Sequence, residues 1–300
     1  NFWNLPSQIH AQSSPEELTS KQNRIVLPPR QPEFKGKIGK NFKESTPDWN
    51  PALPMKAPAG APNIILVVLD DVGYGHLGCY GGPIQTPNID KLASTGLRYN
   101  NFHTTALCSP SRAALLAGRN HHSVGFATIA EMASGFPGAN SFLPKSAASI
   151  AEVLRQTGYA TYCAGKWHLT PTSEQTAAGP FDRWPLGLGF ERFYGFLPGE
   201  VDQWHPMITV DNHRIETPTQ GRRNPDGSTN DYHVSEDIVD ASIKMLRDQQ
   251  QVASGRPFHH VRLVLLSQFA LLRLDSLSLA RGAVLVHLER RALSLQRART

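Results

Sequence analysis

The chain has 300 residues, of which 40% are hydrophobic and 18% are charged, a composition typical of a globular protein with one large or two modest domains. Its longest apolar run, Ile64–Leu69, is too short to cross a bilayer, so we expect no membrane span. The net charge of +5 arises in residues 259–300, where seven arginines are opposed only by Asp275 and Glu289. The rest of the chain is nearly neutral and carries no basic stripe, which argues against nucleic acid as a partner.

Composition divides the chain into three predicted segments. Residues 1–61 contain nine prolines and no helical or strand periodicity, which is typical of an extended arm or leader. Residues 62–258 alternate predicted strands with predicted helices, so we expect an α/β domain with a large, mainly parallel sheet flanked by helices. Residues 259–300 have twelve leucines and seven arginines but no lysine or proline. This abrupt change indicates either an amphipathic helical end or a shifted reading frame.

The first half of the central segment begins with a strand. Asn63–Leu69 is a continuous apolar, largely β-branched run, as in strands buried on both faces. Thr86 and Pro87 suit the N-cap and first position of a short helix that ends before Gly96. We then expect a strand over residues 97–104 and a helix that begins at Cys108 or just after it.

The second half predicts a helix from a Ser146 cap to Gly158, followed by a strand over Tyr159–Ala164. Residues 170–232 are rich in loop-forming residues. A last helix is expected after Ser235, with one apolar stripe formed by Ile238, Ala241/Ser242 and Met245/Leu246.

Two adjacent carboxylates follow the first predicted strand. Asp70 and Asp71 stand where open α/β sheets place ligands, and a turn of the backbone there would let both oxygens reach one hard cation such as calcium or magnesium. The alternative is that they only cap the turn that leads to Gly73.

The second candidate is Cys108-Ser-Pro-Ser-Arg112. Pro110 fits a first helical turn, which would put Cys108 at a helix N-terminus, where N–H groups and the helix dipole stabilise an anion. Arg112 would add a fixed charge beside it. The alternative is a packed cysteine next to a helix cap.

The third candidate is the pair Lys166 and His168. Two residues apart on an extended segment, they would share one face, where a cation and an imidazole suit oxyanion binding and proton transfer. The alternative is two solvated polar residues at a strand end. All three candidates follow predicted strands, so we expect them to meet at one edge of the sheet.

Four motifs occur in a fixed order, and together they carry a resemblance: Asp70-Asp71-x-Gly73, Thr86-Pro-Asn-Ile-Asp90, Leu107-Cys-Ser-Pro-Ser-Arg-Ala-Ala-Leu-Leu-Ala-Gly118-Arg119 and Gly165-Lys-x-His168. From about Pro28 to Phe258 the chain resembles the type I, formylglycine-dependent sulfatases, most of all the bacterial arylsulfatases. The resemblance implies the alkaline-phosphatase-like fold. It also implies hydrolysis of a small-molecule or glycan sulfate ester.

The resemblance implies a role for each candidate residue. Cys108 is the residue that formylglycine-generating enzyme would oxidise, and the hydrated aldehyde would attack sulfur. Asp70, Asp71 and the oxidised Cys108 would bind calcium. Arg112 would orient the hydrate, Lys166 would bind sulfate, and His168 would be the base that releases sulfate by elimination.

The chain departs from the family after Pro257-Phe258. There the family continues with an aromatic-rich strand, a His that protonates the leaving group, an Asp-Asn pair that completes the calcium site and a further Lys. Gln268 stands near the expected His, and nothing after Phe258 matches. We therefore expect the catalytic domain to be incomplete at its C-terminal end.

Two other functions stay open: a phosphonate or phosphodiester hydrolase of the same superfamily, and an inactive, truncated fragment. Family habit favours a periplasmic or secreted protein over a cytoplasmic one. Among the remaining reactive residues, Cys79 and Cys163 are expected to be buried and apolar in character; a disulfide between them stays open, although no pattern in the sequence supports it. We expect His103, His121 and His122 to make local hydrogen bonds. His205 is expected to line a substrate pocket.

Overall fold

The computed structural model describes residues 33–49, 57–216, 232–252, 258–261 and 282–288. The chain divides into two compact units, Asn1–Pro54 and Met55–Thr300. In the first, the short helix η1 (Phe42–Glu44) closes a turn in which Lys37 and Thr46 exchange backbone hydrogen bonds of 2.9 and 2.8 Å. Predicted from its prolines as an extended arm, this segment thus folds back on itself locally.

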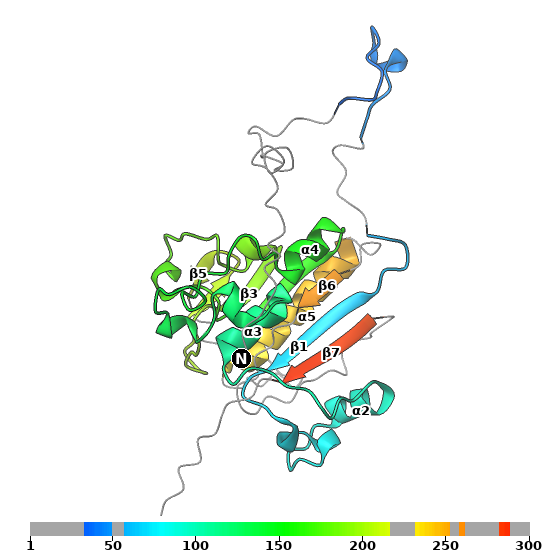
Figure 1. The fold of residues 1–300 in the computed structure, drawn as a ribbon. Coiled ribbons are helices and arrows are strands. Elements are labelled where there is room, and N and C mark those ends of the chain that lie inside the picture. The colour runs from blue at the N-terminus through cyan, green and yellow to red at the C-terminus, as the bar shows by residue number, and fades with distance from the viewer. Residues whose placement is uncertain (1–32, 50–56, 217–231, 253–257, 262–281, 289–300) are drawn as a thin grey trace, which may run out of the picture. The chain divides into compact units, whose positions relative to one another are not determined.

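The described residues of the second unit form a sheet of seven strands, in the order β5-β4-β3-β2-β6-β1-β7 (Figure 1). Pairing is parallel from β3 through β2, β6 and β1 to β7, and antiparallel for β3–β4 and β4–β5. The mainly parallel sheet expected from the sequence is therefore confirmed. Its strands are β1 (Asn63–Leu69), β2 (Ala160–Lys166), β3 (Arg192–Phe196), β4 (Ile208–Val210), β5 (His213–Ile215), β6 (Phe258–Val261) and β7 (Gly282–Leu288).

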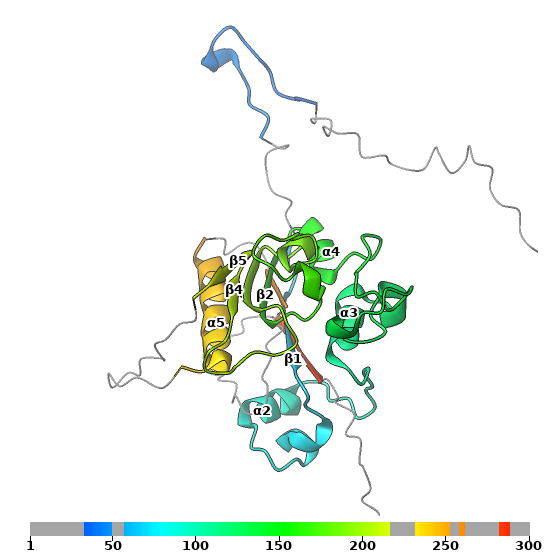
Figure 2. The same ribbon diagram turned by 90° about the vertical axis from the view of Figure 1, so that its left-hand side faces the viewer.

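Four α-helices lie in the described residues of this unit: α2 (Pro87–Thr95), α3 (Cys108–Ala117), α4 (Ile150–Gln156) and α5 (Val234–Val252). Figure 2 shows α5 and α3 on opposite sides of the sheet. Strand β1 packs against the helices on both faces of the sheet, because successive side chains of a strand point to opposite faces. Leu66 and Val68 pack into the cluster that includes α3 and α4, whereas Ile65 and Val67 pack into the cluster that includes α5.

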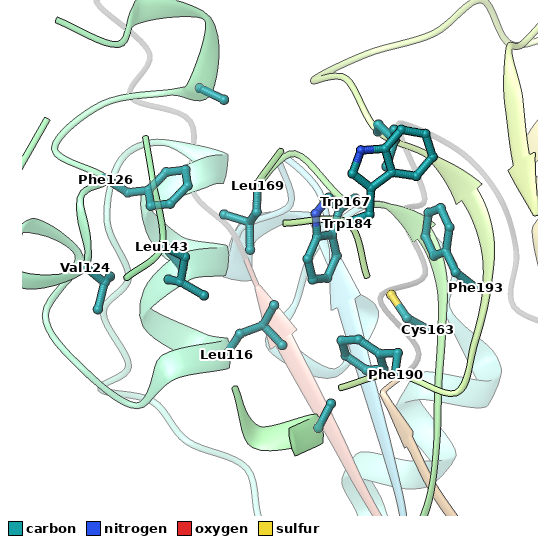
Figure 3. Packing of buried hydrophobic residues seen from close by; sticks show 14 of the residues in the cluster. Leu116, Val124, Phe126, Leu143, Cys163, Trp167, Leu169, Trp184, Phe190 and Phe193 are labelled. Atoms are coloured by element: carbon teal, nitrogen blue, oxygen red, sulfur yellow. The ribbon is translucent and has the colours of Figure 1, made fainter. Parts of the chain in front are cut away.

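Aromatic side chains form the core beneath the segment that follows β2 (Figure 3). Trp167 and Trp184 are fully buried, and their indole N–H groups donate to the backbone oxygens of Arg183 and Glu174. Phe190 meets Trp167 edge-to-face with the ring centroids 5.9 Å apart. The backbone around Trp167 is therefore fixed by packing, and this fixes the residues on either side of it.

One predicted strand is wrong. Residues 97–104 form neither strand nor helix. Leu97 and Tyr99 are 87% and 57% exposed, so the apolar residues of this segment have no sheet to pack against, and β-propensity alone does not make a strand. Cys108 consequently does not follow a strand, although α3 begins where the Cys-x-Pro-x-Arg pattern predicts.

The predicted helices and the strand after α4 agree closely with the structure, but residues 170–232, expected as loops, contain the strands β3, β4 and β5, and residues 282–288 of the tail form β7 rather than a helix. Helix α4 begins after Ser149 rather than Ser146, since the Ser149 hydroxyl accepts the Glu152 N–H at 3.1 Å. Helix α5 buries Ile238, Ser242, Met245 and Leu246, which is the stripe expected from the sequence. No helix among the described residues is long and apolar enough to cross a membrane.

Candidate active site

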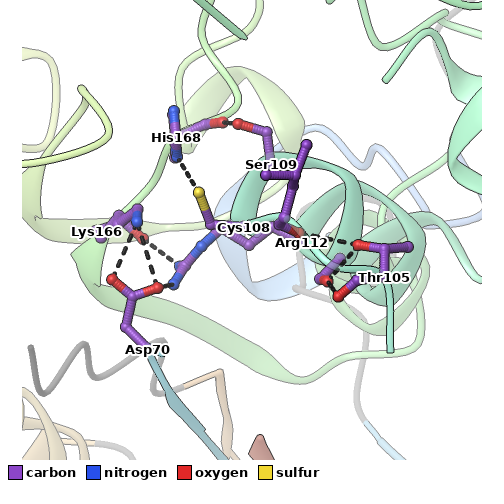
Figure 4. A network of polar contacts seen from close by, with 9 residues as sticks. Asp70, Thr105, Cys108, Ser109, Arg112, Lys166 and His168 are labelled. Atoms are coloured by element: carbon purple, nitrogen blue, oxygen red, sulfur yellow. Dashed lines mark hydrogen bonds and ion pairs between the residues drawn. The ribbon is translucent and has the colours of Figure 1, made fainter. Parts of the chain in front are cut away.

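Helix α3 presents Cys108 as its first residue. Pro110 lies in the first turn, and Gly118, with φ of +62°, ends the helix in the left-handed conformation that glycine adopts most easily. Ser109, Ser111 and Arg112 are buried. The helix is thus anchored by polar residues at the end that carries the cysteine, as Figure 4 shows.

A buried ion-pair network joins the ends of β1 and β2 to this helix. The side chain of Asp70, 10% exposed, accepts from Lys166 Nζ at 3.0 Å and from Arg112 Nη2 at 3.5 Å. Arg112 Nη1 also donates to the Lys166 backbone oxygen at 2.9 Å. Two cations therefore hold one carboxylate, and the local charge beside Cys108 is positive.

A second line of contacts runs through Cys108, His168 and Glu131. Cys108 Sγ lies 3.1 Å from His168 Nδ1, and His168 Nε2 lies 2.7 Å from Glu131 Oε2. The backbone reaches this arrangement by leaving the extended conformation at Gly165, with φ of +105°, and at His168, with φ of +58°. The prediction that Lys166 and His168 share one face of an extended segment is therefore not met. Each still belongs to the site, since Lys166 contacts Asp70 and His168 contacts Cys108.

The surroundings change the acidity of all three groups in this line. Burial raises the pKa of the Cys108 thiol, but the hydrogen bond with His168 and the charges of His168, Lys166 and Arg112 outweigh it and lower the pKa to about 7. Burial lowers the pKa of His168, yet its hydrogen bonds to Cys108 and Glu131 raise it overall. The hydrogen bond with His168 is the main reason that the pKa of Glu131 falls to about 2.

Two residues of this network were not predicted. The Ser109 hydroxyl donates to the His168 backbone oxygen at 2.8 Å and accepts the Ala130 N–H at 3.3 Å. Ser109 stands inside the cysteine motif, so its position in the sequence could have indicated a place in the site. Glu131 lies on a short 3-10 turn, η6 (Ala130–Met132), where no pattern in the sequence distinguishes it from a solvated surface residue.

The described residues do not by themselves fit a calcium ion. Asp71 is exposed and has φ of +56°, and the Asp70 carboxylate is engaged by Lys166 and Arg112. Within the part of the chain that the structure describes, no group of three or more His, Cys, Asp or Glu side chains could hold a metal, whereas calcium takes about six to eight oxygen ligands. The expected position of the leaving-group acid, Gln268, lies outside the described residues.

Six other cysteines and histidines that the sequence singled out lie among the described residues: Cys79, Cys163, His103, His121, His122 and His205. Cys79 and Cys163 are not joined by a disulfide, and Cys163 is fully buried whereas Cys79 is only partly so. His103 and His121 make the expected local hydrogen bonds, at 2.7 Å, to Asn101 Oδ1 and to the Phe126 backbone oxygen respectively. The ring of His122 lies against that of His121, with the ring centroids 4.1 Å apart and the planes tilted by 43°. His205 lies on an exposed loop beside Asp202.

Residues 62–261, more than half of the chain, match the family model described as Sulfatase. Human arylsulfatase A is 44% identical over 151 residues, which cover 49% of this chain and 27% of that protein. An uncharacterized sulfatase of Schizosaccharomyces pombe is 37% identical over 151 residues, covering 48% of this chain and 26% of the relative. The chain thus spans about a quarter of the length of these curated relatives.

Solved structures agree with this match. The crystal structure of Ps i-CgsB in complex with k-i-k-neocarrahexaose has a TM-score of 0.53 and 24% identity, and it covers 70% of this chain and 46% of that one. The fold is that of the alkaline-phosphatase-like sulfatases, as the resemblance implied. The chain belongs to the Sulfatase family, whose named relatives are sulfuric ester hydrolases such as arylsulfatases and a steryl-sulfatase.

Proposed function

We propose that this protein hydrolyses sulfate esters at residue 108, after formylglycine-generating enzyme has oxidised Cys108 to formylglycine. One observation carries the proposal. Cys108 Sγ, at the first residue of α3, lies 3.1 Å from His168 Nδ1 and within the field of Lys166 and Arg112. A hydroxyl at the same place would meet both a proton acceptor and positive charge, which a sulfuryl group needs during transfer.

The oxidised residue would supply, as its hydrate, one hydroxyl whose oxygen bonds to sulfur while the S–O bond to the alcohol breaks, the proton of that hydroxyl passing through solvent to the departing alcohol. A second hydroxyl would then lose its proton, which expels sulfate and restores the aldehyde. His168 accepts that proton at Nδ1, the ring atom that faces residue 108. Lys166 and Arg112 attract the sulfate oxygens and offset the charge that builds up on them. Arg112 also orients residue 108, from which it is separated by one helical turn.

Calcium binding belongs to the same proposal. Asp70 and Asp71 would supply two of the carboxylates of a calcium site whose other ligands do not lie among the described residues, with the oxidised residue 108 beside them. Titration calorimetry with calcium chloride measures this directly on the protein and on Asp71→Asn, with Glu200→Gln as a control for the loss of one carboxylate elsewhere. We expect weaker binding in Asp71→Asn alone; equal binding by all three proteins would contradict the role of Asp71.

Hydrolysis is tested by producing the protein with formylglycine-generating enzyme and assaying an aryl sulfate and an aryl phosphonate side by side. We expect sulfate-ester turnover in the unsubstituted protein and none in Cys108→Ala, with both proteins melting at similar temperatures. Preference for the phosphonate would instead support a phosphonate or phosphodiester hydrolase. Activity retained in Cys108→Ala would contradict the proposed nucleophile.

The substrate class and the location of the protein follow from the family rather than from a contact in the structure. A small-molecule or glycan sulfate ester is the proposed substrate, and a periplasmic or secreted location is proposed over a cytoplasmic one. Fractionation of the producing cell, followed by an assay of each fraction for sulfatase activity, tests the location.

A further inference from the structure

Glu131 and His168 form a hydrogen bond that the proposed chemistry does not by itself require. Glu131 Oε2 lies 2.7 Å from His168 Nε2, on the opposite side of the imidazole from Cys108 Sγ. A carboxylate accepts hydrogen bonds and does not donate them, so the ring nitrogen that faces Glu131 must carry the hydrogen. In the neutral ring, Nδ1 then keeps its lone pair directed at residue 108.

The turn that carries Glu131 and the backbone of His168 are both hydrogen-bonded to the same residue of α3. The Ser109 hydroxyl, fully buried, bridges the Ala130 N–H and the His168 backbone oxygen at 3.3 and 2.8 Å. One side chain of α3 therefore holds the residue before Glu131 and the backbone of His168 at a fixed separation. This bridge helps to hold the turn that carries Glu131 beside the ring, where Glu131 contacts Nε2.

The loop that carries Gly199 lies against the ring of His168 at Cε1 and Nε2. The backbone N–H of Gly199 donates to the Glu131 carboxylate, and a Cβ at position 199 would lie 2.7 Å from both Cε1 and Nε2 of His168. His168 itself is 2% exposed. The imidazole is thus enclosed, and Glu131 is the charged group that contacts its far nitrogen.

We propose that Glu131 is a positioning residue, which fixes the tautomer and the orientation of His168 so that Nδ1 presents its lone pair to residue 108. The inference deepens the proposed sulfatase function and rests on it for its kinetic consequence. A base of fixed tautomer removes a proton without first rotating or re-protonating. The comparable loss of an orienting partner behind a ligating histidine costs about 10- to 100-fold in activity.

The kinetic test compares Glu131→Gln with Glu152→Gln, which makes the same change of charge on α4 away from the site. Turnover of an aryl sulfate should fall about 10- to 100-fold in kcat for Glu131→Gln, with KM nearly unchanged. Glu131→Asp, which keeps the charge on a shorter side chain, should recover part of kcat. Glu152→Gln should match the unsubstituted protein, and melting temperatures confirm that each variant is folded.

A second readout does not depend on activity. Nitrogen-15 NMR of labelled histidine, at a pH where the ring is neutral, reports which nitrogen of His168 carries the hydrogen. In Cys108→Ser, which places a hydroxyl beside Nδ1, we expect a single tautomer with the hydrogen on Nε2. Adding Glu131→Ala should give a mixture of the two tautomers.

The two readouts separate this inference from the proposed function. If the unsubstituted protein hydrolyses no sulfate ester, the proposed function fails, and the NMR result alone decides the positioning role. If the protein is active but Glu131→Gln keeps the kcat of Glu152→Gln, the positioning role is overturned. Identical tautomers with and without Glu131 would overturn it as well.

Discussion

Cys108 Sγ and His168 Nδ1 lie 3.1 Å apart although 60 residues separate them in the chain. One residue begins a helix, and the other follows the last residue of β2 by two positions. Their contact depends on the packing of α3 against the sheet and on the buried Trp167, which fixes the backbone next to His168. The pair is therefore a product of the whole α/β core rather than of either motif alone.

The unconverted Cys108 thiol should react at unusually low pH. Its pKa of about 7, against an ordinary value of 9.0, means that the reactive thiolate is half-populated near pH 7 and that alkylation accelerates as the pH rises through this value. Iodoacetamide labelling of the unoxidised protein, followed by peptide mass spectrometry across a pH series, measures this midpoint.

Two comparisons make that measurement decisive. His168→Ala removes the hydrogen bond and the charge that lower the pKa of the Cys108 thiol most, but it leaves the thiol partly buried. The midpoint of Cys108 labelling should therefore move to higher pH. Cys163, which is fully buried and whose pKa burial raises, should stay unlabelled in the folded protein. A midpoint near 9 in the unsubstituted protein would contradict the described geometry.

The Asp70–Lys166 pair should be strongly coupled. Both side chains are nearly buried, so Lys166→Met removes one of the two cations that contact the buried carboxylate and should cost about 3–5 kcal/mol of unfolding free energy. Asp70→Asn/Lys166→Met should lose less than the sum of the single variants, by about 0.5–3 kcal/mol. Urea unfolding of the four proteins gives the coupling; additive losses would show that the two side chains do not interact.

Close approach of β2 and β3 should make position 195 intolerant of any side chain. A Cβ on Gly195 would lie 2.0 Å from the Gly165 backbone oxygen, within the paired strands that lead to Lys166. We expect Gly195→Ala to destabilise the protein by about 1–3 kcal/mol. Gly75→Ala is the matched control, because nothing lies within 4 Å of its Cβ, and thermal unfolding should show little change for it. Equal melting temperatures for the two variants would contradict this packing.

The apolar face of α3 that packs against the sheet should contribute much of the stability of the protein. Leu116 is 1% exposed in the core between α3 and the sheet, so Leu116→Ala should cost about 2–5 kcal/mol. Leu97→Ala makes the same change at a side chain that is 87% exposed, and it should stay within about 0.5 kcal/mol. Urea midpoints that shift equally for both variants would place α3 away from the core.

Much of the architecture was predictable because it depends on local patterns. The apolar run of β1 needs two covered faces, and the sheet provides them with α5 on one side and α3 and α4 on the other. Pro110 placed the start of α3 correctly, because a first helical turn loses nothing by lacking the N–H of proline. The error at residues 97–104 has the opposite cause: a strand needs a partner, and sequence alone does not reveal whether one is present.

The candidate site was predictable in part for the same reason. Asp70, Cys108, Arg112, Lys166 and His168 stand in recognisable motifs, and the structure brings all five together. Asp71 stands in the same motif but is exposed, and the described residues gather no group of three or more His, Cys, Asp or Glu side chains that could hold a metal. Glu131 lacked any signal, because its contact with His168 arises from a turn fixed by Ser109 and by the Gly199 loop, and both are features of tertiary packing.

The central claim is that residue 108 attacks sulfur and that a second hydroxyl on it expels the sulfate. The most direct test is to incubate Cys108→Ser with an aryl sulfate and to measure the mass of the protein by mass spectrometry. A serine hydroxyl can attack sulfur and release the aryl alcohol, but it has no second hydroxyl through which to expel the sulfate. The account predicts one equivalent of alcohol and a stable sulfate ester on residue 108, localised by peptide mass spectrometry. Continuous turnover by Cys108→Ser, or an unmodified residue 108 under conditions where the converted protein is active, would contradict it.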